Sequence, residues 1–491
     1  MPGSRIIRYA GTAGAGLLAA AGALGGALPG GDVASTPASI ARGPYGWLIL
    51  GCWLAGTVLL AAAWWAARDR VLSSRWIVVT AVLWSVPFLA VPPIGSRDAY
   101  SYACQGHLFV NGLNPYEVGV ATLPCPWLEA VSPIWRDTTA PYGPLFILVA
   151  AAAVALGGSL TAVVLLLRLV AAIGMVTVAW CLPVLARRCG VPANRALWLA
   201  LAGPLVGPHL IGGPHNDAVM IALVVAGLAV ALRFTGPAGQ LGAGALLGLA
   251  AAVKITAVVV LPFAVLIAFR QIARPGQGRA AAGRLAGAAA GALVAVTAAS
   301  GLGSGWLAGL VHTRDLVQFT SPPTAIGMTL TYLARPVLPG FDAVPVVRVL
   351  AIGLLVVVLA GLWLRCARQP GDAVPAALRA AGLGCAATVA LAPFVHPWYV
   401  LAPLILMAAT TVRTDLVMAA ATAEALLVLP DGGGLARFAK FPGAPLMTVL
   451  IVVLLVRRRR RQPAVAPAPA LLAPAAVGRG SGNAPDPRPP G

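Results

Sequence analysis

Long apolar stretches recur along almost the whole chain, from Tyr9 to Val456, and they constrain its fold more than any other feature. A helix needs about 20 mostly apolar residues to cross the ~30 Å hydrocarbon core of a bilayer. Hydrophobic residues make up 59% of the 491 positions and charged residues only 10%. This is more apolar surface than one soluble core can bury, so the sequence predicts an all-α polytopic membrane protein.

Arginine accounts for most of the net charge of +20, and it gathers at the ends of the apolar stretches. Arg68 with Arg70, Arg187 with Arg188, and the run 457–461 are examples. Cytoplasmic loops of membrane proteins are enriched in such residues, and anionic lipid headgroups are their expected neighbours. We therefore expect a lipid bilayer as partner and no nucleic acid, with both termini in the cytoplasm.

The apolar stretches predict about twelve transmembrane helices plus two partial elements in one domain, residues 1–461. The stretch 144–156 covers only ~20 Å as a helix, so a re-entrant or interfacial helix is expected there. The stretch 241–269 is too short for two crossings and predicts a short membrane hairpin with Lys254 near its tip. The Pro/Ala-rich segment 462–491 predicts a disordered cytoplasmic tail. The full spans are expected near 9–29, 45–66, 76–95, 160–186, 196–213, 217–233, 285–303, 344–364, 376–394, 399–412, 415–430 and 444–456.

Four outside loops follow from this topology, at 96–143, near 214–217, at 304–343 and near 395–398. The first is polar and aromatic, and it holds four of the fourteen acidic residues. Cys104 and Cys125 are its only cysteines. Disulfides persist in oxidising compartments, so we predict a bridge between these two residues.

Asp98 comes directly after the third predicted span, where a membrane anchor would hold a carboxylate at the lipid boundary. Such a group suits a general base. A solvated loop acid or a helix cap is the structural alternative for Asp98.

Other polar residues also have structural alternatives. Asp137 beside Arg136 fits equally well with an ion pair that orders the loop. Asn216 and Asp217 precede an apolar run, so either residue also fits a helix cap.

Lys254 lies within an otherwise apolar stretch. Because a charge at membrane depth costs at least ~2.5 kcal/mol, this ammonium needs an anion, either a lipid phosphate or a carboxylate, unless it snorkels to the surface. His396, Trp398 and Tyr399 fit a sugar subsite, although an interfacial aromatic belt explains the two aromatic residues nearly as well. No spaced set of His, Cys and carboxylates predicts a metal site. We expect no cofactor; a divalent cation is compatible with the chemistry but not required by it.

Seven short segments, in this order, resemble the actinobacterial polyprenol-phosphomannose-dependent α-1,6-mannosyltransferases of lipoglycan assembly. The resemblance covers most of the chain except the tail, and the ordered set is specific even though each piece alone is not. The segments are 96–102 (SRDAYSY), 112–116 (GLNPY), 135–137 (WRD), 140–146 (APYGPLF), 213–217 (GPHND), 248–254 (GLAAAVK) and 396–399 (HPWY).

This resemblance implies a GT-C glycosyltransferase fold in the plasma membrane, an outward-facing site and an inverting transfer from polyprenyl-phosphate-mannose to a growing α-1,6-mannan chain of lipomannan or lipoarabinomannan type. It maps the base of the family onto Asp98. We expect the phosphate of the sugar donor to contact Lys254, Arg136, His396 and His215. Residues expected near the acceptor sugar are Tyr100, Tyr102, Asp137, Tyr142, Asn216, Asp217, Trp398 and Tyr399.

Two alternatives remain open from the sequence. A GT-C enzyme that uses another lipid-linked sugar, arabinofuranose or glucose, needs the same base, cations and aromatic walls. A lipid or sugar transporter or flippase would explain the spans and Lys254, but it explains the acidic, aromatic loop at 96–143 poorly and forms no covalent product.

Overall fold

The computed structural model describes residues 2–30, 36–70, 72–272, 276–308, 316–411, 413–435 and 438–460. Over these residues the chain is helical, and the β-structure consists of one isolated antiparallel bridge between Val428 and Gly434. The chain divides into two units, residues 1–448 and 449–491. The tail predicted at 462–491 lies outside the described residues.

The helices of the first half are α1 Pro2–Gly25, α2 Pro37–Arg42, α3 Gly46–Ala66, α4 Ser74–Ser85, α5 Asp98–Val110, α6 Pro144–Gly157, α7 Leu160–Arg188, α8 Ala193–Leu201 and α9 Asp217–Arg233. Those of the second half are α10 Pro237–Val253, α11 Leu261–Arg270, α12 Gln277–Ser300, α14 Pro322–Ala334, α15 Val344–Ala367, α16 Val374–Ala390, α17 Leu401–Thr410, α18 Asp415–Leu426 and α19 Lys440–Arg460. Short helical turns occur at η1 Val86–Leu89, η2 Leu128–Ala130, η3 Pro133–Trp135, η4 Val206–Gly212, η5 Ile255–Val260 and η7 Pro397–Val400.

Five of the described helices are long and apolar enough to cross a membrane, namely α3, α7, α12, α15 and α19 up to Arg457. Each coincides with a predicted span. The predicted count of twelve is not confirmed, because several other predicted spans are shorter helices or broken ones. Proline accounts for part of this difference: Pro87 lies in η1, directly after α4, where a residue without an N–H interrupts the helical ladder.

The predicted span 196–213 is wrong. α8 ends at Leu201, before the Gly203-Pro204 pair, and the chain then forms the π-helix η4. Proline disfavours helical backbone at the residue before it, which explains the end of α8. The axes of η4 and α9 differ by 103°, so the chain turns sharply at 213–216. π-Helical turns often occur at functional sites.

The predicted break at Lys254 is confirmed. α10 ends at Val253, Lys254 has an extended backbone (φ −153°, ψ 123°), and η5 and α11 follow. α10 and α11 both pack against α12. Lys254 therefore lies at the turn between α10 and the helical segment that follows, where the short apolar length of 241–269 predicts a turn.

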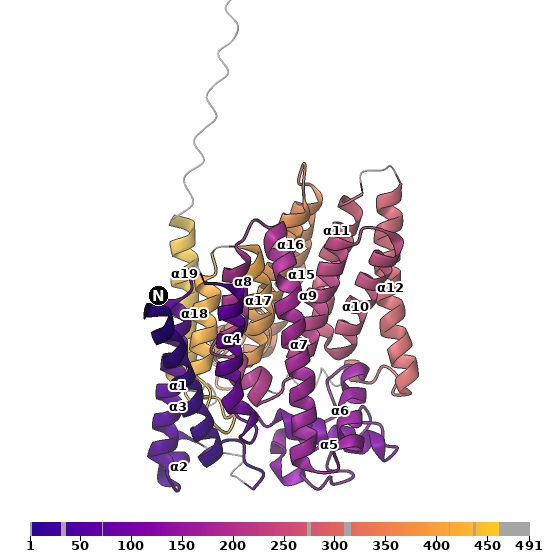
Figure 1. Ribbon diagram of the computed structural model, residues 1–491. Helices are drawn as coiled ribbons and strands as arrows, with labels where there is room; N and C mark the ends of the chain where they lie inside the picture. The colour runs from indigo at the N-terminus through magenta and orange to yellow at the C-terminus, as the bar shows by residue number, and fades with distance from the viewer. Residues whose placement is uncertain are drawn as a thin grey trace, which may run out of the picture. The chain divides into compact units, whose positions relative to one another are not determined.

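Two segments predicted as outside loops contain helices. The segment 96–143 holds α5, which is buried over most of its length and packs against α6. Figure 1 shows α5 and α6 together at one end of the bundle. The segment 304–343 holds α14. Apolar and aromatic residues such as Tyr102 and Leu108 lie on α5 between its few charges, and their burial stabilises the helix.

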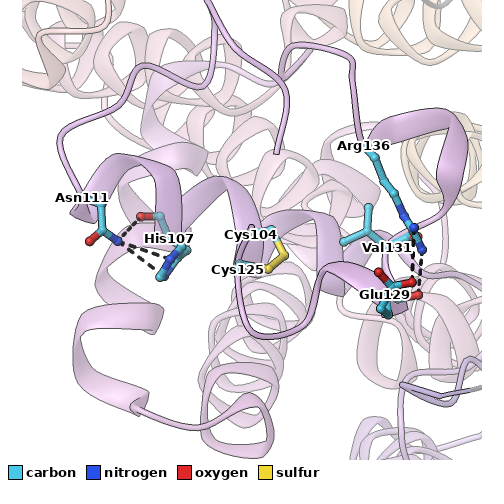
Figure 2. The surroundings of a disulfide bond; sticks show 7 residues. All are labelled: Cys104, His107, Asn111, Cys125, Glu129, Val131 and Arg136. Carbon is cyan, nitrogen blue, oxygen red and sulfur yellow. Dashed lines mark hydrogen bonds and ion pairs between the residues drawn. A yellow bond between two sulfur atoms is a disulfide. The ribbon is translucent and has the colours of Figure 1, made fainter. Parts of the chain in front are cut away.

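The predicted disulfide between Cys104 and Cys125 is confirmed. Figure 2 shows how it joins α5 to the loop that follows. The two Cα atoms lie 5.4 Å apart and the cysteines are separated by 21 positions in the chain. The cross-link ties the loop before η2 to the helix that begins with Asp98.

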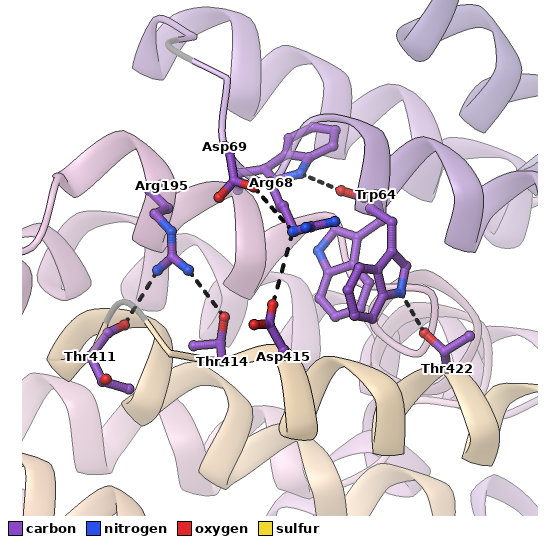
Figure 3. A network of polar contacts seen from close by, with 10 residues as sticks. Trp64, Arg68, Asp69, Arg195, Thr411, Thr414, Asp415 and Thr422 are labelled. Atoms are coloured by element: carbon purple, nitrogen blue, oxygen red, sulfur yellow. Dashed lines mark hydrogen bonds and ion pairs between the residues drawn. The ribbon is translucent and has the colours of Figure 1, made fainter. Parts of the chain in front are cut away.

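A polar network joins helix ends from distant parts of the chain (Figure 3). Arg195 of α8 donates to the Thr411 carbonyl at 3.3 Å and to Thr414 Oγ1 at 3.2 Å. Arg68, just after α3, lies 3.9 Å from the carboxylate of Asp415 in α18. α7, a helix of 29 residues or roughly 43 Å, separates this end of the bundle from α6. The network and the α5–α6 pair therefore lie at opposite ends.

Candidate functional site

Asp98 is the first residue of α5, and the chain before it is held on two sides. Its N–H donates to Ser96 Oγ at 3.0 Å. Gly95 has φ +65°, a conformation that favours glycine, and its N–H donates to the Pro430 carbonyl at 2.9 Å. On the other side, a Cβ built on Gly432 would lie 2.6 Å from Ser96 Cα. The turn at 428–434 therefore packs directly on the residues that place Asp98.

The carboxylate of Asp98 faces a buried histidine. Asp98 Oδ2 lies 3.4 Å from His215 Nδ1, and the Tyr102 hydroxyl lies 3.4 Å from the same nitrogen. The ring of His215 stacks on Trp398 with centroids 3.6 Å apart and an interplanar angle of 20°. The Asp98 side chain keeps 15% of its surface exposed, whereas His215 is fully buried. His215 was predicted to contact the phosphate of the sugar donor, but the structure places it on the buried side of Asp98.

This environment keeps Asp98 ionised. α5 is not among the membrane-crossing helices. Burial raises the pKa of Asp98, but the hydrogen bond to His215, the electrostatic effect of His215 and His396 and the hydrogen bond to Ser96 lower it, and the net effect holds the pKa below its usual range. The carboxylate is therefore ready to accept a proton at neutral pH.

His396 lies on the segment between α16 and η7, next to the same site. Burial lowers the pKa of His396 to about 4, against the opposing effect of Asp98. The ring is therefore neutral at pH 7 and offers one N–H donor and one acceptor instead of a charge, whereas the sequence argument counted it as a cation. It stacks on Trp398 with centroids 4.6 Å apart and an interplanar angle of 8°.

Lys254 has a carboxylate partner. Its Nζ donates to Asp217 Oδ1 at 3.0 Å and to Oδ2 at 2.8 Å. The ammonium also lies 4.4 Å from the ring centroid of Tyr399, within the range of a cation–π contact. Of the two anions considered from the sequence, a lipid phosphate and a carboxylate, the structure shows a carboxylate. Asp217, predicted near the acceptor sugar, is thus the counter-ion of Lys254.

The neighbouring Asn216 occupies the cap position of α9 without a side-chain cap bond. The residue is buried, and neither atom of its amide group has a hydrogen-bond partner among the described residues. The helix-cap alternative for Asn216 is therefore not what the structure shows.

Two cavities meet at Asp98. The first has a volume of about 290 Å³ and mostly apolar walls, supplied in part by Met220, Val224 and Leu406. The second, also about 290 Å³, shares Asp98, Trp135, His396 and Trp398 with the first. Seven predicted site residues line the first cavity: Asp98, Tyr142, Asp217, Lys254, His396, Trp398 and Tyr399.

Six predicted site residues line neither cavity: Tyr100, Tyr102, Arg136, Asp137, His215 and Asn216. Arg136 donates to the carbonyls of Glu129 at 3.0 Å and Val131 at 3.1 Å (Figure 2). Its guanidinium also lies 3.4 Å from the Glu129 carboxylate, so Glu129 takes the place expected for Asp137. The Tyr100 hydroxyl donates to the Ala27 carbonyl. Two residues advance a helix by roughly 200°, so Tyr100 points away from the face of Asp98.

Arg168 is a residue that the sequence reasoning missed. It lies buried within α7 and donates to the Gly212 carbonyl at 2.7 and 3.3 Å and to the Leu89 carbonyl at 3.3 Å. It thereby fixes the end of η4, three residues before His215. An arginine inside an apolar stretch is itself a signal of a structural or functional role, so the sequence contained the clue. Glu424 of α18, which lines the second cavity, was missed as well.

Comparison with known proteins identifies the family. Residues 8–270 match the family model described as "Alpha-(1->6)-mannopyranosyltransferase, N-terminal domain", and residues 323–457 match "MptB C-terminal domain". The chain belongs to the alpha-(1->6)-mannopyranosyltransferase family. The resemblance inferred from the seven segments is confirmed, and with it the assignment of the chain to the mannosyltransferase enzymes.

Relatives in this family include actinobacterial proteins of the genera Mycobacterium, Mycolicibacterium and Corynebacterium. The chain is 35% identical over 362 residues to "Alpha-(1->6)-mannopyranosyltransferase A" of Mycobacterium tuberculosis, covering 71% of this chain and 69% of the relative. It is 29% identical over 491 residues to "Alpha-(1->6)-mannopyranosyltransferase B" of Corynebacterium glutamicum, covering 91% and 81%. No solved structure matches the chain.

Proposed function

We propose that this member of the family transfers mannose from a polyprenyl-phosphate-mannose donor to an α-1,6-mannan chain of a lipoglycan at the outer face of the plasma membrane. One observation carries the proposal: Asp98 and Lys254 line the same, otherwise largely apolar cavity. A base for a hydroxyl, a cation for a phosphate and an apolar wall for a lipid are the three groups that this transfer needs. The names of the relatives support mannose as the sugar.

The first cavity suits the lipid-linked sugar. Its apolar walls come from α9, α16 and α17, and they favour a prenyl chain over water. The ammonium of Lys254 has three N–H donors, two of which bond the carboxylate of Asp217. The third is left for a phosphate oxygen, and the Tyr399 ring below the ammonium keeps it in place.

The reaction follows from these positions. Asp98 accepts the proton of the acceptor 6-hydroxyl while its oxygen attacks the anomeric carbon, which contributes ~10²–10⁴-fold to the rate. The bond from the anomeric carbon to the phosphate oxygen breaks, and the electron pair leaves with polyprenyl phosphate. Lys254 stabilises the charge on that leaving group. A single inversion converts a β-linked sugar donor into an α-linked product.

The distribution of basic residues supports an outward-facing site. Arg68, Arg70 and Arg195 lie at the end of the bundle that carries the polar network, and Arg188 at the end of α7 pairs with Asp372 at 2.6 Å. Asp98 lies on α5, at the opposite end. Because cytoplasmic segments are rich in arginine, we place the network inside the cell, together with both termini, and Asp98 outside.

The test is transfer by the purified full chain in nanodiscs. Labelled polyprenyl-phosphate-mannose is supplied with a short α-1,6-mannoside, in parallel with arabinofuranosyl and glucosyl donors, and the product linkage is determined. We expect mannose to be transferred with formation of an α-1,6 bond. Preference for another sugar donor would contradict the substrate assignment, and movement of lipid without a covalent product would contradict transfer altogether.

A further inference from the structure

The walls of the second cavity differ in chemistry from those of the first. Polar residues from four separate parts of the chain line it, among them Ser96, Gln318, Thr320, Glu424 and Asp431. The glycine run 432–434 exposes backbone groups along one side. Lys254 does not line this cavity, so the cation assigned to the lipid phosphate serves only the first one.

Two polar groups in the second cavity have no partner among the described residues. Thr320 is 6% exposed and its Oγ1 makes no hydrogen bond there. The carboxyl group of Glu424 makes no hydrogen bond or ion pair in the same part of the chain. The neighbouring Asp431, in contrast, accepts the Gly433 N–H at 3.2 Å. A polar group buried without a partner costs free energy, so Thr320 is a group that a ligand would satisfy. Glu424 is partly exposed and offers an unbonded carboxyl group to the same ligand.

The charges around the second cavity favour a neutral ligand. The carboxylates of Asp98 and Asp431 balance the cations of Arg97 and Lys440. Burial raises the pKa of Glu424 to about 8, so this acid is neutral at pH 7. An anionic ligand would therefore meet no excess of positive charge. A ligand rich in hydroxyl groups would instead donate hydrogen bonds to the carboxylates.

Two tryptophans, Trp135 and Trp398, line the second cavity. The rings of His215 and His396 stack on Trp398, so the indole of Trp135 is the one whose large face is suited to the C–H surface of a sugar. Both tryptophans, together with Asp98 and His396, also line the first cavity. A hydroxyl held in the second cavity would thus meet the base at the wall that the two cavities share.

We infer that the second cavity binds the non-reducing end of a mannoside acceptor, with the Glu424 carboxyl group and the Thr320 hydroxyl recognising its hydroxyl groups. This inference rests on the proposed transfer reaction and names the residues that select the acceptor. Glu424 and Thr320 bind the sugar away from the reacting oxygen, and Asp98 alone takes the proton. The lipid-linked sugar and the acceptor then approach Asp98 from different cavities.

The test compares Glu424→Ala and Thr320→Val with the wild-type chain. Binding of α-1,6-mannobiose to the purified full chain is titrated without any sugar donor, and the KM values for donor and acceptor are then measured separately. We expect the mannobiose Kd and the acceptor KM to rise about 10- to 100-fold for Glu424→Ala, as for a sugar hydroxyl left without its hydrogen-bond partner, and less for Thr320→Val. The donor KM should change less than about 2-fold.

Glu117→Ala is the matched control, because Glu117 is an exposed residue that accepts a hydrogen bond from Asn114 and lines neither cavity. A wild-type chain that does not bind mannobiose, or variants whose mannobiose Kd and acceptor KM equal those of the wild type, would overturn the inference. The binding titration needs no turnover. Failure of the proposed transfer reaction would therefore appear as wild-type binding without product, which is distinct from failure of the acceptor assignment.

Discussion

Replacing His215 with Gln tests how the site keeps its base ionised. His215 Nδ1 lies 3.4 Å from Asp98 Oδ2, and His215 is fully buried. Burial raises the pKa of Asp98, and His215 supplies the largest opposing effect, with smaller ones from His396 and Ser96. In the variant the burial remains while its main compensation is removed, so the pKa of Asp98 rises.

The size of the effect follows from the hydrogen bond. A hydrogen bond to a charged group contributes ~1.5–3 kcal/mol, and about 1.4 kcal/mol is a factor of 10 in an equilibrium constant. The ratio of protonated to ionised Asp98 at a given pH should therefore increase by roughly 10- to 100-fold. A general base works only when ionised, so activity is present above the pKa of Asp98 and is lost as the pH falls through it.

The assay is the initial rate of mannose transfer from pH 4 to pH 8 with both substrates saturating. The acid limb of the wild type should lie at a lower pH than an ordinary aspartate gives, because the pKa of Asp98 is lowered, and that of His215→Gln should move toward neutral pH. His107→Gln is the matched control, because His107 lies on α5 and is bonded to Asn111, away from Asp98. A His215→Gln profile that coincides with the wild-type profile would refute the proposed role of His215.

Three further changes test the supports of the site. Lys254→Met leaves the Asp217 carboxylate buried without its partner and should cost ~3–5 kcal/mol of stability. Adding Asp217→Asn should restore the thermal midpoint of unfolding but not the KM for the sugar donor. Recovery of both quantities would contradict phosphate binding by Lys254. Arg168→Met leaves the carbonyls of Gly212 and Leu89 without their donor and should lower the thermal midpoint by the equivalent of roughly 1–3 kcal/mol per carbonyl; an unchanged midpoint would show that η4 does not need Arg168. Cys104→Ser should cost ~2–4 kcal/mol of stability while kcat stays near the wild-type value, and a large loss of kcat in folded protein would give the disulfide a direct part in the reaction.

The charged and polar site residues that interrupt or follow an apolar stretch were predictable from the sequence. Asp98, Lys254 and His396 each interrupt or follow an apolar stretch, and the structure brings all three to one cavity. The local signal was sufficient because a charged or polar side chain at membrane depth is costly and persists where it has a role.

Other parts of the site depend on contacts that no local pattern contains. The stacking of His215 on Trp398 joins residues 183 positions apart, and Glu424 reaches the second cavity from α18. The apolar run 196–213 was predicted to be a full span. In the structure, Gly203-Pro204 and Pro208 interrupt the α-helix there. Arg136 and Asp137 were assigned to the site because they lie in a matching motif, yet the structure places Arg136 on Glu129.

The most direct measurement of the central claim is mannose transfer by Asp98→Ala, with binding of the lipid-linked sugar measured in the same preparation. If the carboxylate is the base, the variant should bind the sugar donor as the wild type does, while kcat falls ~10²–10⁴-fold, equivalent to ~2.7–5.4 kcal/mol in the barrier. Turnover within a few-fold of the wild type would show that another group takes the proton.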